Sequence, residues 1–304
     1  MNDIGAAPPL NRDGDNEVIN GVTFIHRFAR GGGITWHYVE TGARDAEDYI
    51  FLHGGPESWY SWHYQMEGLA TRCHCISIDL KGFGQTDKPD GDYSVTAIAK
   101  QLSELIAGIG VKRYNLSGHD WGTMVGDPLA DRDQDKVIRY LRMQGWVLVQ
   151  DTTNVPHALI FKKDPGLAEK IMVDADKFVR LVYAKNTVKP VPEHDLQRII
   201  LEFSRPGIAQ AFPRYFRDLD ENMQSEEGLR RRKNMFASWK FPVLLLQADS
   251  DPLQPQRIFD SAISAFQNAT LVWVTDSGHF TELEQPEQVT RALLDYMAKT
   301  PGQQ

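Results

Sequence analysis

The sequence predicts an α/β fold, a mostly parallel β-sheet flanked by helices with a helical cap inserted into it. Three observations lead to this prediction. Apolar runs typical of buried strands alternate with segments of helical periodicity, and a sharp glycine-bounded turn at 118–122 follows one of those runs. The strand pattern then lapses from 152 to 220 and resumes at Phe241, so we interpret the middle segment as an insertion.

The N-terminal part predicts a tail followed by a hairpin. Residues 1–20 are polar and contain prolines, which indicates a flexible tail. Residues 21–42 hold two strand-like runs around the turn Arg30-Gly31-Gly32-Gly33. We therefore expect an antiparallel hairpin at the edge of the sheet.

Strands and helices alternate in the next part of the chain. The runs 49–53 and 73–79 predict strands that bracket a helix near 58–70. Between 94 and 109 apolar residues recur at helical spacing, and Gly110 is a typical helix stop.

The second half defines the domain boundaries. The apolar run 140–149 predicts a further core strand, charged helical segments fill 152–220, and 241–246 (FPVLLL) predicts a strand that resumes the sheet. The resulting division is a flexible tail (1–20), a core formed by 21–151 and 221–304, and a helical cap (152–220).

The composition is that of a globular protein with an acidic surface. A chain of 304 residues, 41% of them hydrophobic, can bury one large core. The formal net charge of −8 argues against nucleic acid or an anionic membrane as a partner. The N-terminus lacks a signal-peptide pattern and no stretch reaches 18 apolar residues, so we expect a soluble, cytoplasmic protein.

The two cysteines do not indicate a disulfide or a metal site. Cys73 and Cys75 flank His74 on a predicted strand. Neighbours so close rarely form an unstrained disulfide, and two thiols with one histidine fall short of the four ligands typical of zinc. We expect buried thiols, no metal and no cofactor.

The glycine-bounded turn carries a carboxylate. Gly118-His119-Asp120-Trp121-Gly122 has the pattern of a nucleophile elbow, a strand-to-helix turn, with Asp120 in the place of the nucleophile. A Cβ at either flanking glycine would collide with the turn. An ionised carboxylate needs no activating base. Attack on a saturated carbon would form an alkyl-enzyme ester that water must then break, as in the opening of an epoxide or the displacement of a halide.

Two backbone N–H groups are candidates for an oxyanion hole. A predicted strand ends at His53-Gly54-Gly55-Pro56, where a glycine pair lets N–H groups point into a cavity. We expect Gly55 and Trp121, the residue after the nucleophile, to supply the donors.

An acid and a histidine follow in the chain order expected for such a site. Asp249 and Asp251 come after the strand at 241–246, and His279 comes after the last predicted strand. Residues two apart on an extended segment point to opposite sides, so only one of the two aspartates can face His279. The spacing alone leaves Asp251 and Asp249 both open for this role.

These motifs resemble the epoxide hydrolase and haloalkane dehalogenase branch of the α/β-hydrolases, and are most similar to epoxide hydrolases. The similar blocks are HGGPESWYSW (53–62), IDLKGFGQTDKP (78–89), SGHDWG (117–122), ADSDP (248–252) and GHFTELEQPEQV (278–289). The resemblance implies an α/β-hydrolase fold in which Asp120 is the nucleophile, His279 the base that activates water, and Asp251 the acid that orients His279.

The resemblance also implies proton donors in the cap, because an opening epoxide leaves an alkoxide. Tyr215 lies in a segment similar to a late-cap motif of epoxide hydrolases, although Phe216 stands directly before Arg217, so the match is out by one residue. His157 lies near the place of the first cap donor, and Tyr183 is a third candidate. Aromatic packing is the alternative role of both tyrosines.

The pocket is expected to take a small hydrophobic substrate. We predict that His53, Pro56, Trp121 and Phe280 line it. A second halide ligand is not evident, since Gly55 occupies the place where many dehalogenases carry one and 152–220 contains no tryptophan. The oligomeric state stays open, with a homodimer as one alternative.

Three functions remain open from the sequence. The favoured one is an epoxide hydrolase that forms a vicinal diol through an alkyl-Asp120 ester, which a water activated by His279 then hydrolyses. The first alternative is a haloalkane or haloacid dehalogenase with the same two steps. The second is a ligand-binding protein on the same scaffold, because a fold does not fix a function.

Overall fold

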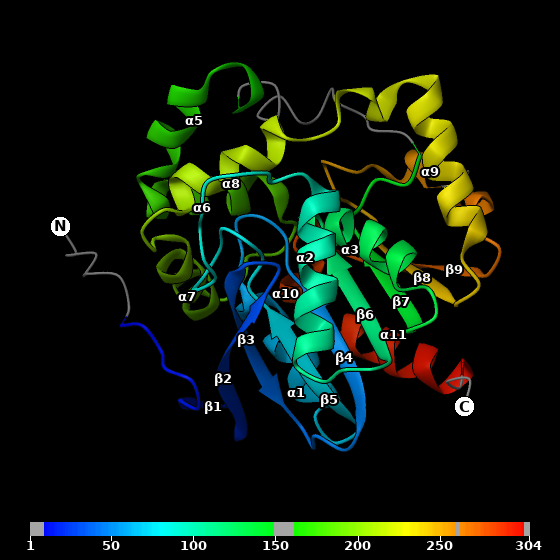
Figure 1. Ribbon diagram of the computed structural model, residues 1–304, viewed down its shortest axis with the longest axis horizontal. Helices are drawn as coiled ribbons and strands as arrows, with labels where there is room; N and C mark the ends of the chain where they lie inside the picture. The colour runs from blue at the N-terminus through cyan, green and yellow to red at the C-terminus, as the bar shows by residue number, and fades with distance from the viewer. Residues whose placement is uncertain (1–8, 149–160, 260–261, 301–304) are drawn as a thin grey trace.

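A twisted sheet runs through the middle of the protein, with helices on its faces and a helical layer above one edge (Figure 1). The computed structural model describes residues 9–148, 161–259 and 262–300. In these residues the sheet has nine strands: β1 (Asn16–Ile19), β2 (Val22–Gly31), β3 (Ile34–Thr41), β4 (Glu47–Leu52), β5 (Cys73–Ile78), β6 (Tyr114–His119), β7 (Val137–Met143), β8 (Val243–Ala248) and β9 (Ala269–Val274).

The strand order is β1-β2-β3-β5-β4-β6-β7-β8-β9. Strands β1 to β3 and the β3–β5 pair are antiparallel, whereas all pairs from β5 to β9 are parallel. Strands β5, β6 and β8 are buried along their whole length, as strands covered on both faces must be. The predicted mostly parallel α/β sheet is confirmed.

Helices of the core cover the sheet. In Figure 1, α2 and α3 lie in front of the strands, and α11 lies behind them. The helices and short 3-10 turns of the core are η1 (Trp59–Trp62), α1 (His63–Leu69), α2 (Val95–Gly108), α3 (Trp121–Arg132), α9 (Glu226–Ser238), η4 (Gln256–Ile258), η5 (Ala262–Ala265), α10 (Thr281–Glu284) and α11 (Pro286–Lys299). None of the helices in the described residues has the length and apolar character needed to cross a bilayer.

In the described residues, four of the helices between β7 and β8 form the layer above the sheet (Figure 1). They are α5 (Pro165–Met172), α6 (Ala175–Asn186), α7 (Glu193–Phe203) and α8 (Ile208–Arg217), followed by η3 (Glu221–Gln224). We call the described residues 161–217 the cap. They fall within the segment predicted to be helical, 152–220.

Two details differ from the sequence prediction. Ordered structure begins inside the expected tail, because β1 (Asn16–Ile19) pairs with β2 and takes the edge of the sheet outside the predicted hairpin. The strand expected at 140–149 ends at Met143, because Gln144 adopts a positive φ of 42° and turns the chain away. The cysteines Cys73 and Cys75 are buried free thiols.

Candidate active site

The sequence forces a tight turn between β6 and α3. Asp120 occupies this turn with φ 49° and ψ −114°, a conformation that non-glycine residues rarely adopt. A Cβ on Gly118 would lie 2.7 Å from the carbonyl oxygen of Gly122, and a Cβ on Gly122 would lie 2.1 Å from that of Leu52. Both flanking glycines are therefore required, and the strained turn lifts the Asp120 carboxylate above the carboxyl ends of the strands.

Two groups face the oxygens of Asp120. The backbone N–H of Gly55 donates to Oδ1 at 3.0 Å, and Nε2 of His279 lies 3.6 Å from Oδ2. Gly55 therefore stands in the place expected of an oxyanion donor. Trp121, the other predicted donor, is the first residue of α3.

The structure separates the two candidate acids. Oδ2 of Asp251 lies 2.9 Å from Nδ1 of His279, and Asp251 is buried. The carboxylate of Asp249 instead accepts the backbone N–H groups of Asp276 and Ser277 at 3.1 and 3.3 Å. The geometry thus brings together Asp120, His279 and Asp251, and leaves Asp249 to brace the loop before the histidine.

The charges in this group stabilise one another. Burial alone would raise the pKa of Asp120, but the hydrogen bond and charge of His279, the charge of His119 and the Gly55 N–H lower it below its ordinary value of 3.8. Burial alone would lower the pKa of His279, yet the carboxylates of Asp251 and Asp120 raise it well above 6.5. In the free protein Asp120 is therefore an anion that faces a protonated His279.

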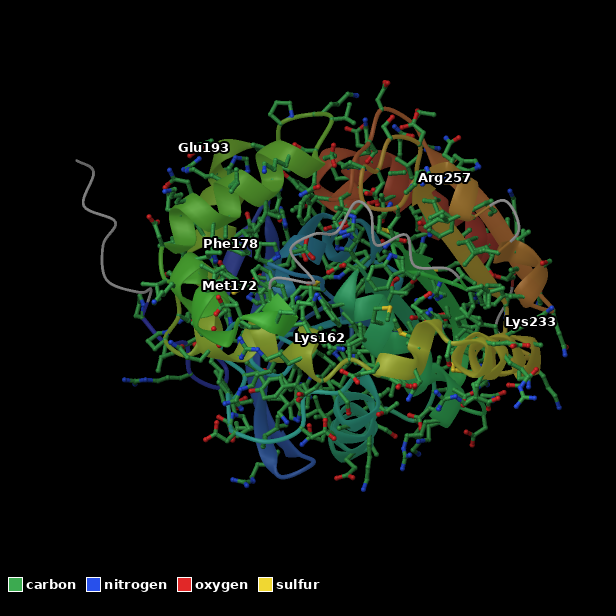
Figure 2. The ribbon with its side chains drawn as sticks, turned by 90° about the horizontal axis from the view of Figure 1, so that it is seen from above. Lys162, Met172, Phe178, Glu193, Lys233 and Arg257 are labelled. Atoms are coloured by element: carbon green, nitrogen blue, oxygen red, sulfur yellow. The ribbon has the colours of Figure 1, made fainter. Side chains whose placement is uncertain are left out.

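A cavity of about 420 Å³ lies directly above Asp120. Its floor comes from the core and includes Gly55, Pro56, Asp120, Trp121, His279 and Phe280. Its roof comes from the cap and is mostly apolar, with Phe161, Ile171, Phe178, Leu181, Phe212 and Phe216. Seen from above, Met172 and Phe178 lie in the cap on the opposite side of the molecule from Lys233 and Arg257 (Figure 2).

The cap touches the floor of the cavity closely. The N–H of His279 donates to the carbonyl oxygen of Asn186 at 2.7 Å, and a Cβ on Gly278 would lie 2.3 Å from the same oxygen. A Cβ on Gly55 would lie 2.4 Å from the ring of Phe212. Glycines at these two positions let cap and core close around the carboxylate.

The structure corrects the prediction that Tyr215 is a proton donor. Its hydroxyl donates to the carbonyl oxygen of Lys81 at 2.7 Å, and its ring packs edge-on against Trp121. The side chain is buried, and Tyr215 does not line the cavity. Because its proton is already committed to the backbone, Tyr215 has the packing role that was its alternative.

Tyr183 and His157 are the other two candidate proton donors. Tyr183 is stacked on Phe280 with ring centroids 3.9 Å apart, and it does not line the cavity either, which corrects that prediction. Its hydroxyl is buried and has no hydrogen-bond partner among the described residues. His157 lies outside the described residues.

His53 was predicted to line the pocket and does not. Its Nδ1 donates to the carbonyl oxygen of Gly54 at 2.7 Å, and its Nε2 accepts the N–H of Leu80 at 3.0 Å. Burial lowers its pKa, which suits a neutral ring that donates at one nitrogen and accepts at the other. Pro56, Trp121 and Phe280 do line the cavity, as predicted.

Sequence reasoning missed a polar wall of the cavity. Gln144 and Gln254 both line it, and the Gln254 side-chain amide donates to the Gln144 carbonyl oxygen. Gln144 directly follows β7, and the carboxyl ends of parallel strands are where binding residues collect in such sheets. The place of Gln144 directly after a parallel strand was therefore the sequence signal that could have identified it as a pocket residue.

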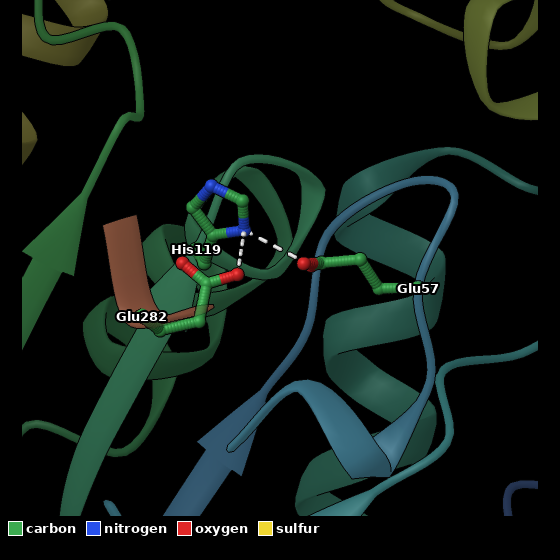
Figure 3. A group of neighbouring side chains, drawn as sticks. All are labelled: Glu57, His119 and Glu282. Carbon is green, nitrogen blue, oxygen red and sulfur yellow. Dashed lines mark hydrogen bonds and ion pairs between the residues drawn. The ribbon is translucent and has the colours of Figure 1, made fainter. Parts of the chain in front are cut away.

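Among the described residues, one group of three side chains brings potential metal-ligand atoms together: Glu57, His119 and Glu282. All three are buried beneath the cavity floor, and Figure 3 shows the two carboxyls converging on one ring nitrogen. His119 precedes Asp120 in the chain, so this cluster adjoins the candidate nucleophile.

Comparison with known proteins defines the class. A model of the alpha/beta hydrolase fold family matches residues 50–286. The chain therefore belongs to the alpha/beta hydrolase fold family.

Individual relatives narrow the class to one branch. The chain is 24% identical to epoxide hydrolase 2 of Caenorhabditis elegans, across 90% of this chain and 79% of the relative. It is 26% identical to a haloalkane dehalogenase of Bradyrhizobium diazoefficiens, across 88% and 92%. The protein is an α/β hydrolase related to both groups.

Solved structures agree on the fold. The epoxide hydrolase CorEH superposes with a TM-score of 0.78 at 22% identity, covering 91% of this chain and 99% of that one. A putative ancestral haloalkane dehalogenase gives a TM-score of 0.78 at 26% identity, covering 90% and 99%.

Proposed function

We propose that the protein hydrolyses a substrate at a saturated carbon in two steps, through an ester between that carbon and Asp120. An epoxide is the first substrate class, and the product is then a vicinal diol. The observation that carries the proposal is the ionised Asp120 in a strained turn beneath an apolar cavity, with Gly55 on one oxygen and His279 near the other.

In the first step, Asp120 attacks the substrate carbon. The Gly55 N–H occupies Oδ1, so Oδ2 is the oxygen available for attack. A bond forms from Oδ2 to carbon while the carbon–oxygen bond of the epoxide breaks, and the resulting alkoxide takes up a proton from solvent water. The lowered pKa of Asp120 keeps the attacking group ionised without a base.

In the second step, water attacks the ester carbonyl carbon. Alkylation removes the negative charge of Asp120, and with it one of the two carboxylates that raise the pKa of His279. His279 therefore releases a proton more readily in the ester than in the free protein. The neutral ring then takes a proton from the attacking water, while Asp251 holds Nδ1–H and the Gly55 N–H stabilises the oxyanion. The bond between the acyl carbon and the alkyl oxygen then breaks, the leaving alkoxide takes the proton from His279, and the diol leaves with Asp120 restored as a carboxylate.

A carbon–halogen substrate is the second candidate, and one observation favours it. No tyrosine is among the described residues that line the cavity, whereas the indoles of Trp121 and Trp146 are. A departing halide needs no proton, and it can be stabilised by indole N–H groups. Both substrates give the same alkyl-Asp120 chemistry and differ only in the leaving group.

Trapping the ester distinguishes the candidates. A His279→Gln variant should accumulate alkylated Asp120, which adds the mass of the whole epoxide or the mass of a haloalkane without HX. Incubation with panels of both compounds, followed by mass spectrometry of the peptide that carries Asp120, identifies the class. An unmodified Asp120 with every compound, in a variant that is folded, would contradict the proposal.

A further inference from the structure

The buried cluster of Glu57, His119 and Glu282 would carry an excess of negative charge if both of its glutamates were ionised. Nδ1 of His119 lies 3.0 Å from Oε2 of Glu57 and 3.4 Å from Oε1 of Glu282 (Figure 3). The three side chains are at most 1% exposed. Two ionised carboxylates with at most one cationic ring would leave a net negative charge buried, which a site without water strongly disfavours.

The hydrogen bonds of His119 determine its protonation. Its Nε2 lies 2.9 Å from the carbonyl oxygen of His279, which can only accept, so Nε2 carries a hydrogen. Nδ1 lies nearest to Oε2 of Glu57, at 3.0 Å, and that oxygen already accepts the N–H of Gly54 at 2.6 Å, so an unprotonated Nδ1 would oppose lone pair to lone pair there. His119 is therefore a cation here, and one of the two carboxyls must be neutral to balance the cluster.

The two glutamates differ in the donors that they receive. Oε2 of Glu57 accepts the N–H of Gly54 at 2.6 Å in addition to His119. Oε1 of Glu282 has only the longer 3.4 Å contact with Nδ1 of His119, and neither of its oxygens accepts a hydrogen bond from another residue that the structure describes. Donors stabilise an anion, so Glu57 is the carboxylate and Glu282 is the neutral acid.

We propose that Glu282 is a positioning residue of the active site, which carries a proton at neutral pH and, as a neutral acid beside Glu57, fixes the His119–Glu57 ion pair behind the nucleophile. Its polar atoms and those of its two partners lie within 4.8 Å of one another. The role in positioning rests on the proposed function, whereas the protonation does not.

The ion pair joins three parts of the site. Glu57 holds the N–H of Gly54, next to the Gly55 that contacts Asp120. His119 holds the carbonyl oxygen of His279 and precedes Asp120 in the chain. A displaced ion pair would shift the oxyanion donor, the nucleophile and the base together, and misplacement of a reacting group by about 1 Å costs about 100-fold in rate.

The charged groups around Glu282 support its neutral state. Burial, then the negative charge of Glu57 and that of Glu284 on the same helix, raise the pKa of Glu282 well above 4.5. At Glu57 burial also acts to raise the pKa, but the charge and hydrogen bond of His119 outweigh it and lower the pKa of Glu57 to about 2. His53, in the loop after β4, also lies near Glu57, but as a neutral ring it adds no charge to the cluster. From α6, the buried hydroxyl of Tyr183 faces Glu57 and Glu282 and is itself without a hydrogen-bond partner among the described residues.

The first test measures protonation without reference to activity. Infrared difference spectra between the wild type and Glu282→Gln, at neutral pH, should show one protonated carboxylic acid that the variant lacks. Because the folded pKa of Glu282 is raised, unfolding releases a proton above pH 4.5, so stability falls as pH rises through that window. The melting temperature of the wild type should therefore decline relative to Glu282→Gln as pH increases, and Glu287→Gln, an exposed neighbour, should show neither effect.

The second test separates positioning from mere packing. Glu282→Ala should slow both alkylation and ester hydrolysis by about tenfold or more, and the neutral amide of Glu282→Gln should rescue both rates to within about threefold. Glu57→Gln removes the anion of the ion pair, so it should not keep the rates of alkylation and ester hydrolysis within about threefold of the wild type.

Three outcomes would overturn the proposal. One is an infrared difference spectrum in which Glu282→Gln has lost a carboxylate band of the wild type and no carboxylic acid band. Another is a Gln variant as slow as the Ala variant. The third is a stoichiometric divalent metal in the purified wild type that is lost in Glu282→Gln, which would make the cluster a metal site. A wild type that alkylates no epoxide or haloalkane would refute the proposed function and leave the infrared and stability results standing.

Discussion

The floor and the roof of the cavity are built on different principles. The floor consists of residues at the carboxyl ends of parallel strands, where short glycine-bounded turns fix each group: Gly55 after β4, Asp120 after β6 and His279 after β9. The roof consists of cap helices whose apolar faces pack over that floor. Backbone geometry therefore fixes the positions of the groups in the floor, whereas side-chain packing fixes the positions of the helices in the roof.

This difference explains which groups can carry the chemistry. Every polar contact to Asp120 and His279 given above comes from the core, except that the carbonyl oxygen of Asn186, at the end of α6 in the cap, accepts the N–H of His279. The cap tyrosines, Tyr183 and Tyr215, point their hydroxyls elsewhere. We expect substitutions in the floor to abolish the reaction and substitutions of these tyrosines to change mainly stability.

The largest effect is expected at the nucleophile. Among the described residues that line the cavity, Asp120 is the only carboxylate, so Asp120→Ala should lower turnover by about 1000-fold or more while the fold survives. The measurement is steady-state hydrolysis with circular dichroism as the control for folding. A variant that kept a few per cent of the wild-type rate would show that another group attacks the substrate.

The two neighbouring aspartates provide a matched pair. Asp251→Asn leaves His279 without the anion that orients it and stabilises its cation, and should slow ester hydrolysis by about 100- to 10,000-fold. Asp249→Asn touches only backbone N–H groups and should stay within about threefold of the wild type. Single-turnover kinetics separate the two steps, and equal losses in both variants would contradict the assignment of the acid.

The two steps should respond differently to pH. Asp120, whose pKa is lowered below 3.8, is ionised throughout the range from about pH 5 to about pH 8, so the alkylation rate should be flat there. Ester hydrolysis needs a neutral His279 and should slow as pH falls, because Asp251 still raises the pKa of that ring. Stopped-flow rates for each step check this, and an alkylation rate that followed the same curve as hydrolysis would show that His279 takes part in both.

Tyr215→Phe should have the smallest effect on the reaction. The hydroxyl bonds to the Lys81 carbonyl oxygen, so its loss should destabilise the fold by about 1 kcal/mol and leave the alkylation rate unchanged. Urea unfolding and pre-steady-state alkylation with an epoxide measure the two quantities. A drop of about 100-fold in alkylation would mean that the hydroxyl reaches the substrate after all.

The same contrast governs what could be predicted from the sequence. The turn at Asp120 and the loop at His279 depend on local glycines, so their positions follow from short motifs. The alternation of side chains on an extended segment predicts that only one of Asp249 and Asp251 faces His279, and the resemblance of the loop to the family favours Asp251. The partner of Tyr215, the Lys81 carbonyl oxygen, is 134 residues away, and no local pattern reveals it.

Two fold details escaped prediction for similar reasons. Strand β1 is only four residues long and exposes Val18, so it lacks the apolar alternation that marks a strand. The apolar run at 140–149 continues past the end of β7, and the positive φ of Gln144 that stops the strand has no signature in residue type.

The formation of a covalent ester on Asp120 is the central claim, and one measurement tests it most directly. His279→Gln protein, mixed with an epoxide in water enriched in heavy oxygen, should show one burst of substrate consumption and then stop, with the substrate mass attached to the peptide that contains Asp120. Wild-type protein taken through repeated turnovers in the same water should carry heavy oxygen in the Asp120 carboxylate, because water attacks the ester carbonyl. A diol that forms while Asp120 is never labelled and never alkylated would mean that water attacks the substrate directly, and would contradict the account.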